Sequence, residues 1–150
     1  MSKTDGSVEE DAKRFGWLEN PNKNSVAKKP RILVVDDLPS NLKLIRVLLS
    51  SEGYSVSTTV DAEDALLAVM DEPPELIVTY LHMPGMEGVA FIRGLKLNKS
   101  TSHIPILAVT SSDTTAEETK LAKLAGCDST YMRPINTRTL KNIIAKLLNK

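Results

Sequence analysis

The sequence contains few of the residues that form covalent cross-links or bind transition metals. Its 150 residues include one cysteine, Cys127, and two histidines, His82 and His103. A single cysteine cannot form an internal disulfide and does not complete a zinc site, so we expect Cys127 to be a small buried thiol. His103 precedes an apolar run and is expected to be solvated rather than to bind a ligand.

Long apolar runs are also missing. No run reaches the length of a membrane-spanning helix, and Lys3 is not followed by the apolar segment of a secretory signal. These absences predict a cytoplasmic protein that does not enter the membrane.

The chain carries no excess of either charge. It has 19 Lys and Arg against 19 Asp and Glu, so the formal net charge at pH 7 is +0. Nucleic-acid and membrane-surface binders normally carry a basic patch or tail, so we expect neither kind of partner. A content of 41% hydrophobic and 25% charged residues is typical of a globular protein, and the length suits one domain.

Residues 1–30 differ in composition from the rest of the chain. They are rich in Ser, Asn, Lys and Glu, which predicts a mostly flexible N-terminal extension. A capping-box pattern followed by apolar residues at helical spacing predicts a short helix near residues 8–15. Val8, Ala12 and Phe15 fall on one face of this helix, and Trp17 and Leu18 are further apolar anchors. A helix this short is marginal alone, so it would need its own domain or a partner to pack against.

From residue 31 onward, apolar runs typical of strands alternate with apolar residues at helical spacing. The expected strands cover residues 31–35, 54–60, 75–79, 104–110 and 129–132. The expected helices cover residues 39–53, 61–72, 87–98, 115–126 and 136–150. This alternation predicts an α/β fold, a doubly wound parallel sheet with helices on both faces. Functional groups in such sheets collect at the carboxyl ends of the strands.

Polar side chains end or directly follow four of the five expected strands. In chain order they are Asp36 and Asp37, Tyr80, Thr110 and Ser111, and Arg133. Two adjacent carboxylates suit a hard cation such as Mg²⁺, which prefers oxygen ligands. Asp37 could equally cap the helix that follows it, and the spacing alone does not separate these two interpretations.

Four segments together resemble the response-regulator receiver domain of two-component signalling: ILVVDDLPSNLKLI, PPELIVTYLHMPGMEG, IPILAVTS and GCDSTYMRPI. The resemblance covers residues 31–150, in order and with the family's spacing. It implies a flavodoxin-like sheet of five strands in the order 2-1-3-4-5 with five helices. It also implies signalling partners such as a histidine kinase, a phosphotransferase or a downstream effector, and leaves a homodimer open.

In this family, an acidic pair after the first strand holds Mg²⁺ and an aspartate at the end of the third strand accepts a phosphoryl group. The resemblance places Asp36 and Asp37 at the acidic pair and the backbone of His82 beside the metal. It places Tyr80 at the acceptor position. A phenol, with an unperturbed pKa of about 10, is ionised in only about one molecule per thousand at neutral pH. We therefore expect no phosphorylation of Tyr80 and weak or absent Mg²⁺ binding.

Two further positions depart from the family pattern. Thr110 matches the hydroxyl residue that contacts the phosphate, but Arg133 replaces the lysine and Thr130 replaces the aromatic switch residue. We expect Arg133 to form an internal ion pair with the acidic pair, or to lie over the Tyr80 ring. Tyr131 is one position away from the switch and should point to the other face of its strand.

Three functions stay open. The favoured one is a stand-alone pseudo-receiver, a non-enzymatic protein-interaction module that acts independently of phosphorylation. The alternative is a working single-domain response regulator phosphorylated at another site, such as Asp36 or Asp37. A small-ligand sensor is disfavoured, because DDLPSN stands where a Gly-rich phosphate loop would follow the first strand.

Overall fold

The computed structural model describes residues 29–82 and 88–149 of the chain. The expected extension over residues 1–30 and its helix near residues 8–15 lie outside the described residues, apart from the last two residues of the extension. Within the described part, no helix is long and apolar enough to cross a membrane.

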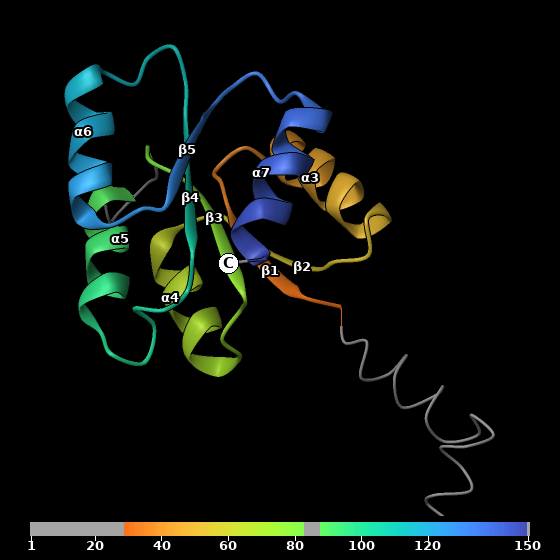
Figure 1. The fold of residues 1–150 in the computed structure, drawn as a ribbon, viewed down its shortest axis with the longest axis horizontal. Coiled ribbons are helices and arrows are strands. Elements are labelled where there is room, and N and C mark those ends of the chain that lie inside the picture. Colours follow the sequence, from red (N-terminus) through yellow and green to blue (C-terminus); the bar gives the residue numbers. More distant parts are fainter. Residues whose placement is uncertain (1–28, 83–87, 150) are drawn as a thin grey trace, which may run out of the picture.

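Strands and helices alternate along the described chain (Figure 1). The strands are β1 (Arg31–Val35), β2 (Ser55–Thr59), β3 (Leu76–Tyr80), β4 (Ile106–Thr110) and β5 (Ser129–Met132). The helices are α3 (Pro39–Ser51), α4 (Ala62–Asp71), α5 (Gly88–Leu97), α6 (Ala116–Ala125) and α7 (Thr137–Leu148). All the expected elements between residues 31 and 149 are present. The third strand includes Tyr80 instead of ending before it, because Tyr80 still pairs with Val109 of β4.

The five strands form one parallel sheet in the order β2-β1-β3-β4-β5, which confirms the expected topology. Figure 1 shows α3 and α7 on one face of the sheet and α4, α5 and α6 on the other. Because the strands are parallel, their carboxyl ends lie along one edge and their amino ends along the opposite edge. The residues that follow β1, β3, β4 and β5 are therefore brought together.

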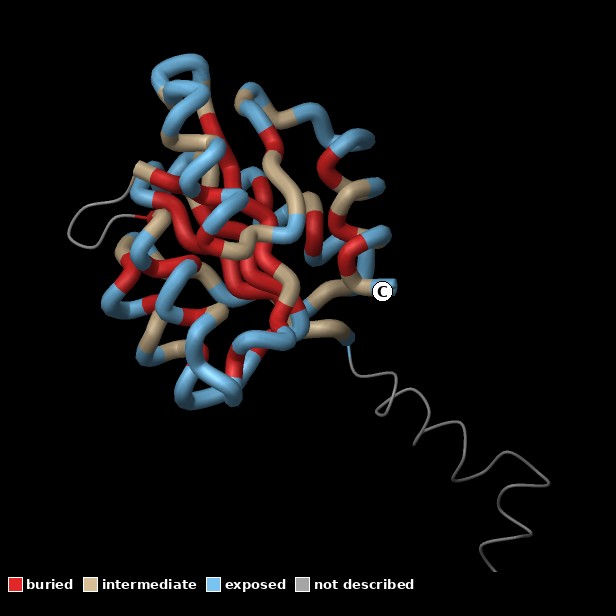
Figure 2. Tube along the Cα trace, turned by 60° about the vertical axis from the view of Figure 1, so that its left-hand side comes forward, coloured by how far each residue is buried: buried red, intermediate tan, exposed pale blue. Residues whose placement is uncertain are grey.

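Two apolar layers hold the helices against the sheet. The central strands β1, β3 and β4 are almost entirely buried, which explains their continuous apolar runs. Leu49 of α3 and Ile144 of α7 are fully buried on one face, and Phe91 and Ile92 of α5 are buried on the other. Figure 2 shows the buried residues, in red, concentrated in the central strands.

Short capping motifs fix the helix ends. Asp61 begins α4 by accepting a hydrogen bond from the backbone N–H of Asp64 at 2.7 Å. Thr115 and Glu118 form a capping box at the start of α6. Gly126 ends that helix with a φ of 116°, in the left-handed region that favours glycine.

The burial of α3 gives a matched pair of tests. Leu49 has no exposed surface, whereas Leu44 on the same helix is 46% exposed. We expect Leu49→Ala to lower the free energy of unfolding by about 2–5 kcal/mol, because it removes buried apolar surface and leaves a cavity. Leu44→Ala should change it by less than about 1 kcal/mol. Urea denaturation of both variants measures the difference, and equal losses would contradict the described packing.

Candidate functional site

The carboxyl edge of the sheet brings the predicted side chains of separate strands together. Asp36 follows β1, Tyr80 ends β3, Thr110 ends β4 and Arg133 follows β5. The backbone N–H of Arg133 donates to the carbonyl oxygen of Thr110 at 2.8 Å, which fixes the end of β5 beside β4. The Arg133–Pro134 peptide bond is cis.

Arg133 lies at the centre of this edge. Its Nη2 atom donates to Oδ2 of Asp36 and forms an ion pair with that carboxylate. The centre of its guanidinium group lies 3.9 Å from the centroid of the Tyr80 ring. The two contacts expected as alternatives are therefore made together. Only 16% of the Arg133 side chain and 4% of the Asp36 side chain are exposed, so the pair is largely shielded from water.

The two carboxylates of the acidic pair have different surroundings. Oδ1 of Asp36 accepts a hydrogen bond from the backbone N–H of Leu38 at 2.9 Å, and Oδ2 lies 3.5 Å from Nδ2 of Asn41. Asp37 is exposed. The N-cap residue of α3 is Leu38, with no capping hydrogen bond from a side chain. The interpretation of Asp37 as a helix cap is therefore wrong, because the neighbouring Asp36 turns towards the backbone of this loop instead.

Tyr80 is held from several sides. Its ring packs against apolar residues of both faces of the sheet, and its hydroxyl lies 3.2 Å from Oγ of Ser111. Sequence analysis placed Ser111 after the fourth strand but gave it no role. Thr110, the expected hydroxyl position, is 4% exposed, and its Oγ1 lies 3.5 Å from the carbonyl oxygen of Tyr131.

The two neighbouring residues of β5 point in different directions. Thr130 is half-buried and pairs in register with Ala108. Tyr131 is buried among the side chains of α3 and α7, which confirms that it faces the opposite side of the sheet from Thr130. Its hydroxyl donates to the carbonyl oxygen of Pro134 at 3.2 Å and accepts from the backbone N–H of Asn136. These bonds fix the tyrosine in the loop before α7.

His82 connects this edge to α6 by a contact that sequence analysis missed. Its Nε2 atom lies 2.8 Å from Oε2 of Glu118, an ion-pair distance for a protonated imidazole but without the alignment of a hydrogen bond. Its ring is tilted against that of Tyr80, with centroids 5.7 Å apart. The backbone N–H of Thr115 donates to Glu118 and, together with the nearby His82, lowers the pKa of that carboxyl. His103 is exposed near the opposite edge of the sheet and takes no part here.

Weak or absent Mg²⁺ binding at this edge stays a prediction, and two features of the described side chains bear on it. Among residues 29–82 and 88–149, no three His, Cys, Asp or Glu side chains come close enough together to hold a metal. The guanidinium group of Arg133 already places a positive charge against Asp36. A divalent cation at this carboxylate would have to overcome that repulsion.

Comparison with known proteins agrees with this architecture. Residues 32–145 match the family model of the response regulator receiver domain. The response regulator PleD of Caulobacter vibrioides is 41% identical over 83 residues, which cover 55% of this chain and 18% of PleD. The polar-differentiation response regulator DivK of Brucella ovis is 29% identical over 105 residues, covering 70% of this chain and 85% of DivK. The chain thus spans only a small part of PleD.

Solved structures show the same fold. The chemotaxis response regulator CheY4 of Vibrio cholerae superposes with a TM-score of 0.74 at 25% identity. The match covers 79% of this chain and 98% of CheY4.

The buried ion pair gives a test of the edge. We expect Arg133→Met to lower the free energy of unfolding by about 3 kcal/mol, because it leaves the buried Asp36 carboxylate without its counter-charge. The exposed Arg138 on α7 is a matched control, and Arg138→Met should have little effect. Adding Asp36→Asn to Arg133→Met should recover part of the loss. Chemical denaturation of the wild type, Arg133→Met, Asp36→Asn, the double variant and the Arg138→Met control measures these effects, and additive effects of the two site changes would contradict the ion pair.

The capping box of α6 gives a pH-dependent test. The pKa of Glu118 is lowered in the folded chain, chiefly by the hydrogen bond from Thr115. The stabilisation from the ionised Glu118 carboxylate is therefore complete above the pKa of glutamate in the unfolded chain. It is lost as the pH falls through the lower pKa of Glu118 in the folded chain. We expect the melting temperatures of wild type and Glu118→Gln to differ most at neutral pH and to converge on acidification. Glu117→Gln, in the same helical turn, is the control, and a gap that widens in acid would contradict the assignment.

Proposed function

The chain belongs to the response regulator receiver domain family, and from that premise we propose that it is a pseudo-receiver. In this proposal it acts as a protein-interaction module of two-component signalling whose binding surface does not depend on phosphorylation. The single observation that carries the proposal is the guanidinium group of Arg133, paired with Asp36 and stacked on the ring of Tyr80.

The first support is the chemistry of Tyr80. Phosphoryl transfer to a side chain needs a nucleophilic oxygen in line with the phosphorus, with positive charge to neutralise the transferring group. The neutral hydroxyl of a tyrosine lacks the charge of an aspartate, and here it lies beside the Ser111 hydroxyl. The ring is covered by Arg133. Tyr80 is thus a packing residue at the position where the family pattern expects an acceptor.

The second support is electrostatic. In a receiver that binds metal, a divalent cation would compensate the buried carboxylate that follows β1. Here Arg133 supplies a positive charge from within the chain, and its planar guanidinium group suits a carboxylate better than the compact ammonium of a lysine. The buried Asp36 carboxylate is therefore paired without any ligand.

The third support is the missing conformational switch. A switch needs an element with two arrangements that the input can bias. Thr130 has no ring to move, and Tyr131 is anchored on the other face by its hydrogen bonds to the loop before α7. We therefore infer a constant surface at α6, β5 and α7, available to a signalling partner such as a histidine kinase, a phosphotransferase or an effector without chemical input.

Phosphate labelling tests the proposal. Incubation with acetyl phosphate and Mg²⁺ should leave the mass of the wild-type protein unchanged, because no acceptor carboxylate stands at position 80. The double variant Tyr80→Asp/Arg133→Lys restores both family residues and serves as the positive control, with an expected gain of one acyl phosphoryl group that is labile in acid and in base. Labelling of the wild type at Asp36 or Asp37 would overturn the proposal and favour a working response regulator.

A metal titration gives a second test. We expect the amide resonances of Asp36, Asp37 and His82 to stay unchanged as Mg²⁺ is raised to low millimolar concentration, because Arg133 repels a cation from Asp36. The same titration of the Tyr80→Asp/Arg133→Lys variant should shift these signals. Saturable shifts in the wild type would show that the arginine does not replace the metal.

A further inference from the structure

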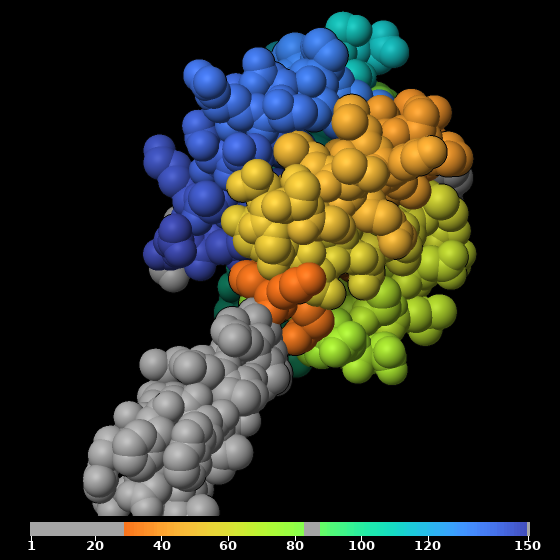
Figure 3. Space-filling model, turned by 90° about the vertical axis from the view of Figure 1, so that its right-hand side faces the viewer, coloured from red at the N-terminus to blue at the C-terminus, as the bar shows by residue number. Residues whose placement is uncertain are grey.

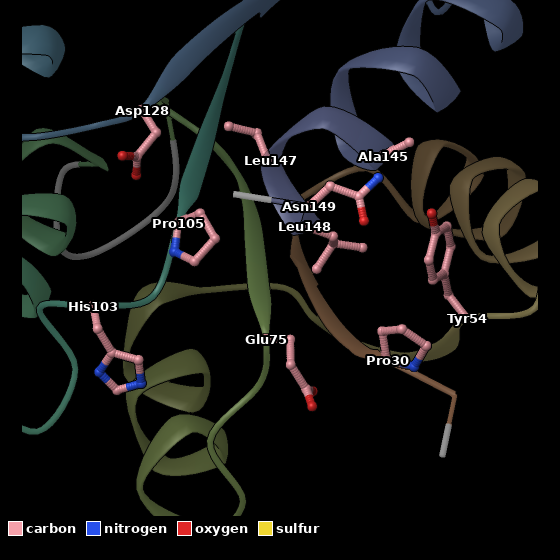
Figure 4. Close-up of a pocket in the computed structure, with 10 residues that line it drawn as sticks. All are labelled: Pro30, Tyr54, Glu75, His103, Pro105, Asp128, Ala145, Leu147, Leu148 and Asn149. Carbon is pink, nitrogen blue, oxygen red and sulfur yellow. The ribbon is translucent and has the colours of Figure 1, made fainter. Parts of the chain in front are cut away.

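A cavity of about 490 Å³ opens at the amino edge of the sheet, opposite the edge that holds Arg133. Residues that precede several strands and the last turn of α7 form its walls (Figure 4). Pro30 and Tyr54 lie on one side, Pro105 lies on the other, and Leu147 and Leu148 of α7 lie between them. The volume falls within the range of about 300–1,000 Å³ that is typical of ligand pockets.

Both carboxylates that line this cavity have partners within the domain. Oε1 of Glu75 accepts from the backbone N–H of Arg31 at 2.8 Å. Oδ2 of Asp128 accepts from the backbone N–H of Ile106 at 2.8 Å and lies 3.1 Å from Nζ of Lys96. Neither acid therefore needs a charged ligand, which leaves the apolar side chains of the walls, together with the polar His103 and Asn149, to recognise an occupant. The cavity suits an uncharged group that combines apolar surface with a polar atom.

The N-terminal segment of the same chain contains such groups. Pro30 is part of the cavity wall, so residues 1–29 are tethered to its rim. Figure 3 shows the first described residues, in orange, at the surface of the molecule. The tethered segment contains three large apolar residues within four positions, Phe15, Trp17 and Leu18. Trp17 is the single tryptophan of the protein.

The length of the tether allows this segment to return to the cavity. Lys29 lies 12 positions after Trp17 in the sequence. Twelve residues span at most about 40 Å when extended, and a flexible linker of that length has a root-mean-square span of about 20 Å. A tether in this range gives an effective concentration of the order of millimolar, which a free partner would have to exceed.

We propose that the cavity is the docking site of the chain's own N-terminal segment, with Trp17 as the anchoring side chain. Tryptophan combines a large apolar surface with one N–H donor, and burying it removes about 150–250 Å² from water. The side-chain amide of Asn149, which lines the cavity, offers an acceptor for that donor. This docking uses the amino edge of the sheet and is independent of the pseudo-receiver proposal, which concerns the carboxyl edge.

Fluorescence of the full-length protein tests the docking, because Trp17 is the only tryptophan. In the native wild type, we expect a blue-shifted emission and an acrylamide quenching constant about threefold below that of the chain in denaturant. Leu148→Lys and Tyr54→Ala, at two different walls, should each raise the native quenching constant towards the denatured value. Leu124→Lys should not, because Leu124 is 74% exposed on α6 and does not line the cavity.

Circular dichroism first checks that each variant is folded. If one of the two cavity variants is unfolded, the quenching test relies on the other one. A native quenching constant equal to that in denaturant would overturn the proposal. Protection of Trp17 from acrylamide that persists in both cavity variants would overturn it as well. Protection that disappears on dilution would show that the occupant is a second copy of the chain and would overturn the intramolecular assignment. Concentration-independent protection that both cavity variants abolish supports docking within one chain.

Discussion

Asp36 carries its charge at the carboxyl end of β1, where only 3% of the residue is exposed. A carboxylate buried this deeply must be compensated by an opposite charge and by hydrogen bonds. Arg133 provides the charge from 97 positions later in the sequence. β1 and β5 are not neighbours in the sheet, because β3 and β4 lie between them. The arginine therefore has to reach across the edge, and the face of the Tyr80 ring supports it on the way.

In this geometry, Tyr80 and Arg133 are suited to each other. A tyrosine provides a flat surface on which a guanidinium group can stack, and an arginine is long and planar enough to use it. The Tyr80 side chain also contacts Ser111 in the loop after β4. Its ring lies against the ring of His82, which follows β3. His82 in turn lies against Glu118 in the capping box of α6. One continuous set of side chains thus joins segments that follow β1, β3, β4 and β5.

The two edges of the sheet consequently have different characters. At the carboxyl edge, the buried Asp36 is paired with Arg133, whose guanidinium group lies over the Tyr80 ring. The amino edge contains the cavity, whose two acidic residues are also paired and whose walls combine apolar and polar surface. Under the proposals made above, the first edge needs no ligand, and the second accommodates a tethered segment of the same chain. Both features would favour a domain with one persistent conformation.

The amino-acid sequence by itself determined the alternation of strands and helices, because fully buried parallel strands require continuous apolar runs and surface helices require apolar residues at helical spacing. It also placed Asp36, Tyr80 and Arg133 at strand ends, which parallel pairing gathers at one edge. It could not choose between an ion pair and a stacking contact for Arg133, and both contacts occur.

The roles of Ser111 and Glu118, and the choice of Asp36 over Asp37, were decided only by tertiary structure. Ser111 meets Tyr80 across 31 positions, and His82 meets Glu118 across the distance between β3 and α6. The two aspartates are adjacent and chemically identical, so no local pattern distinguishes them. Asp36 lies in the buried position from which it meets the backbone of Leu38 and the side chain of Arg133, whereas Asp37 faces solvent. Side-chain direction at a strand end depends on the packing of neighbouring strands and helices, and that packing exists only in the folded chain.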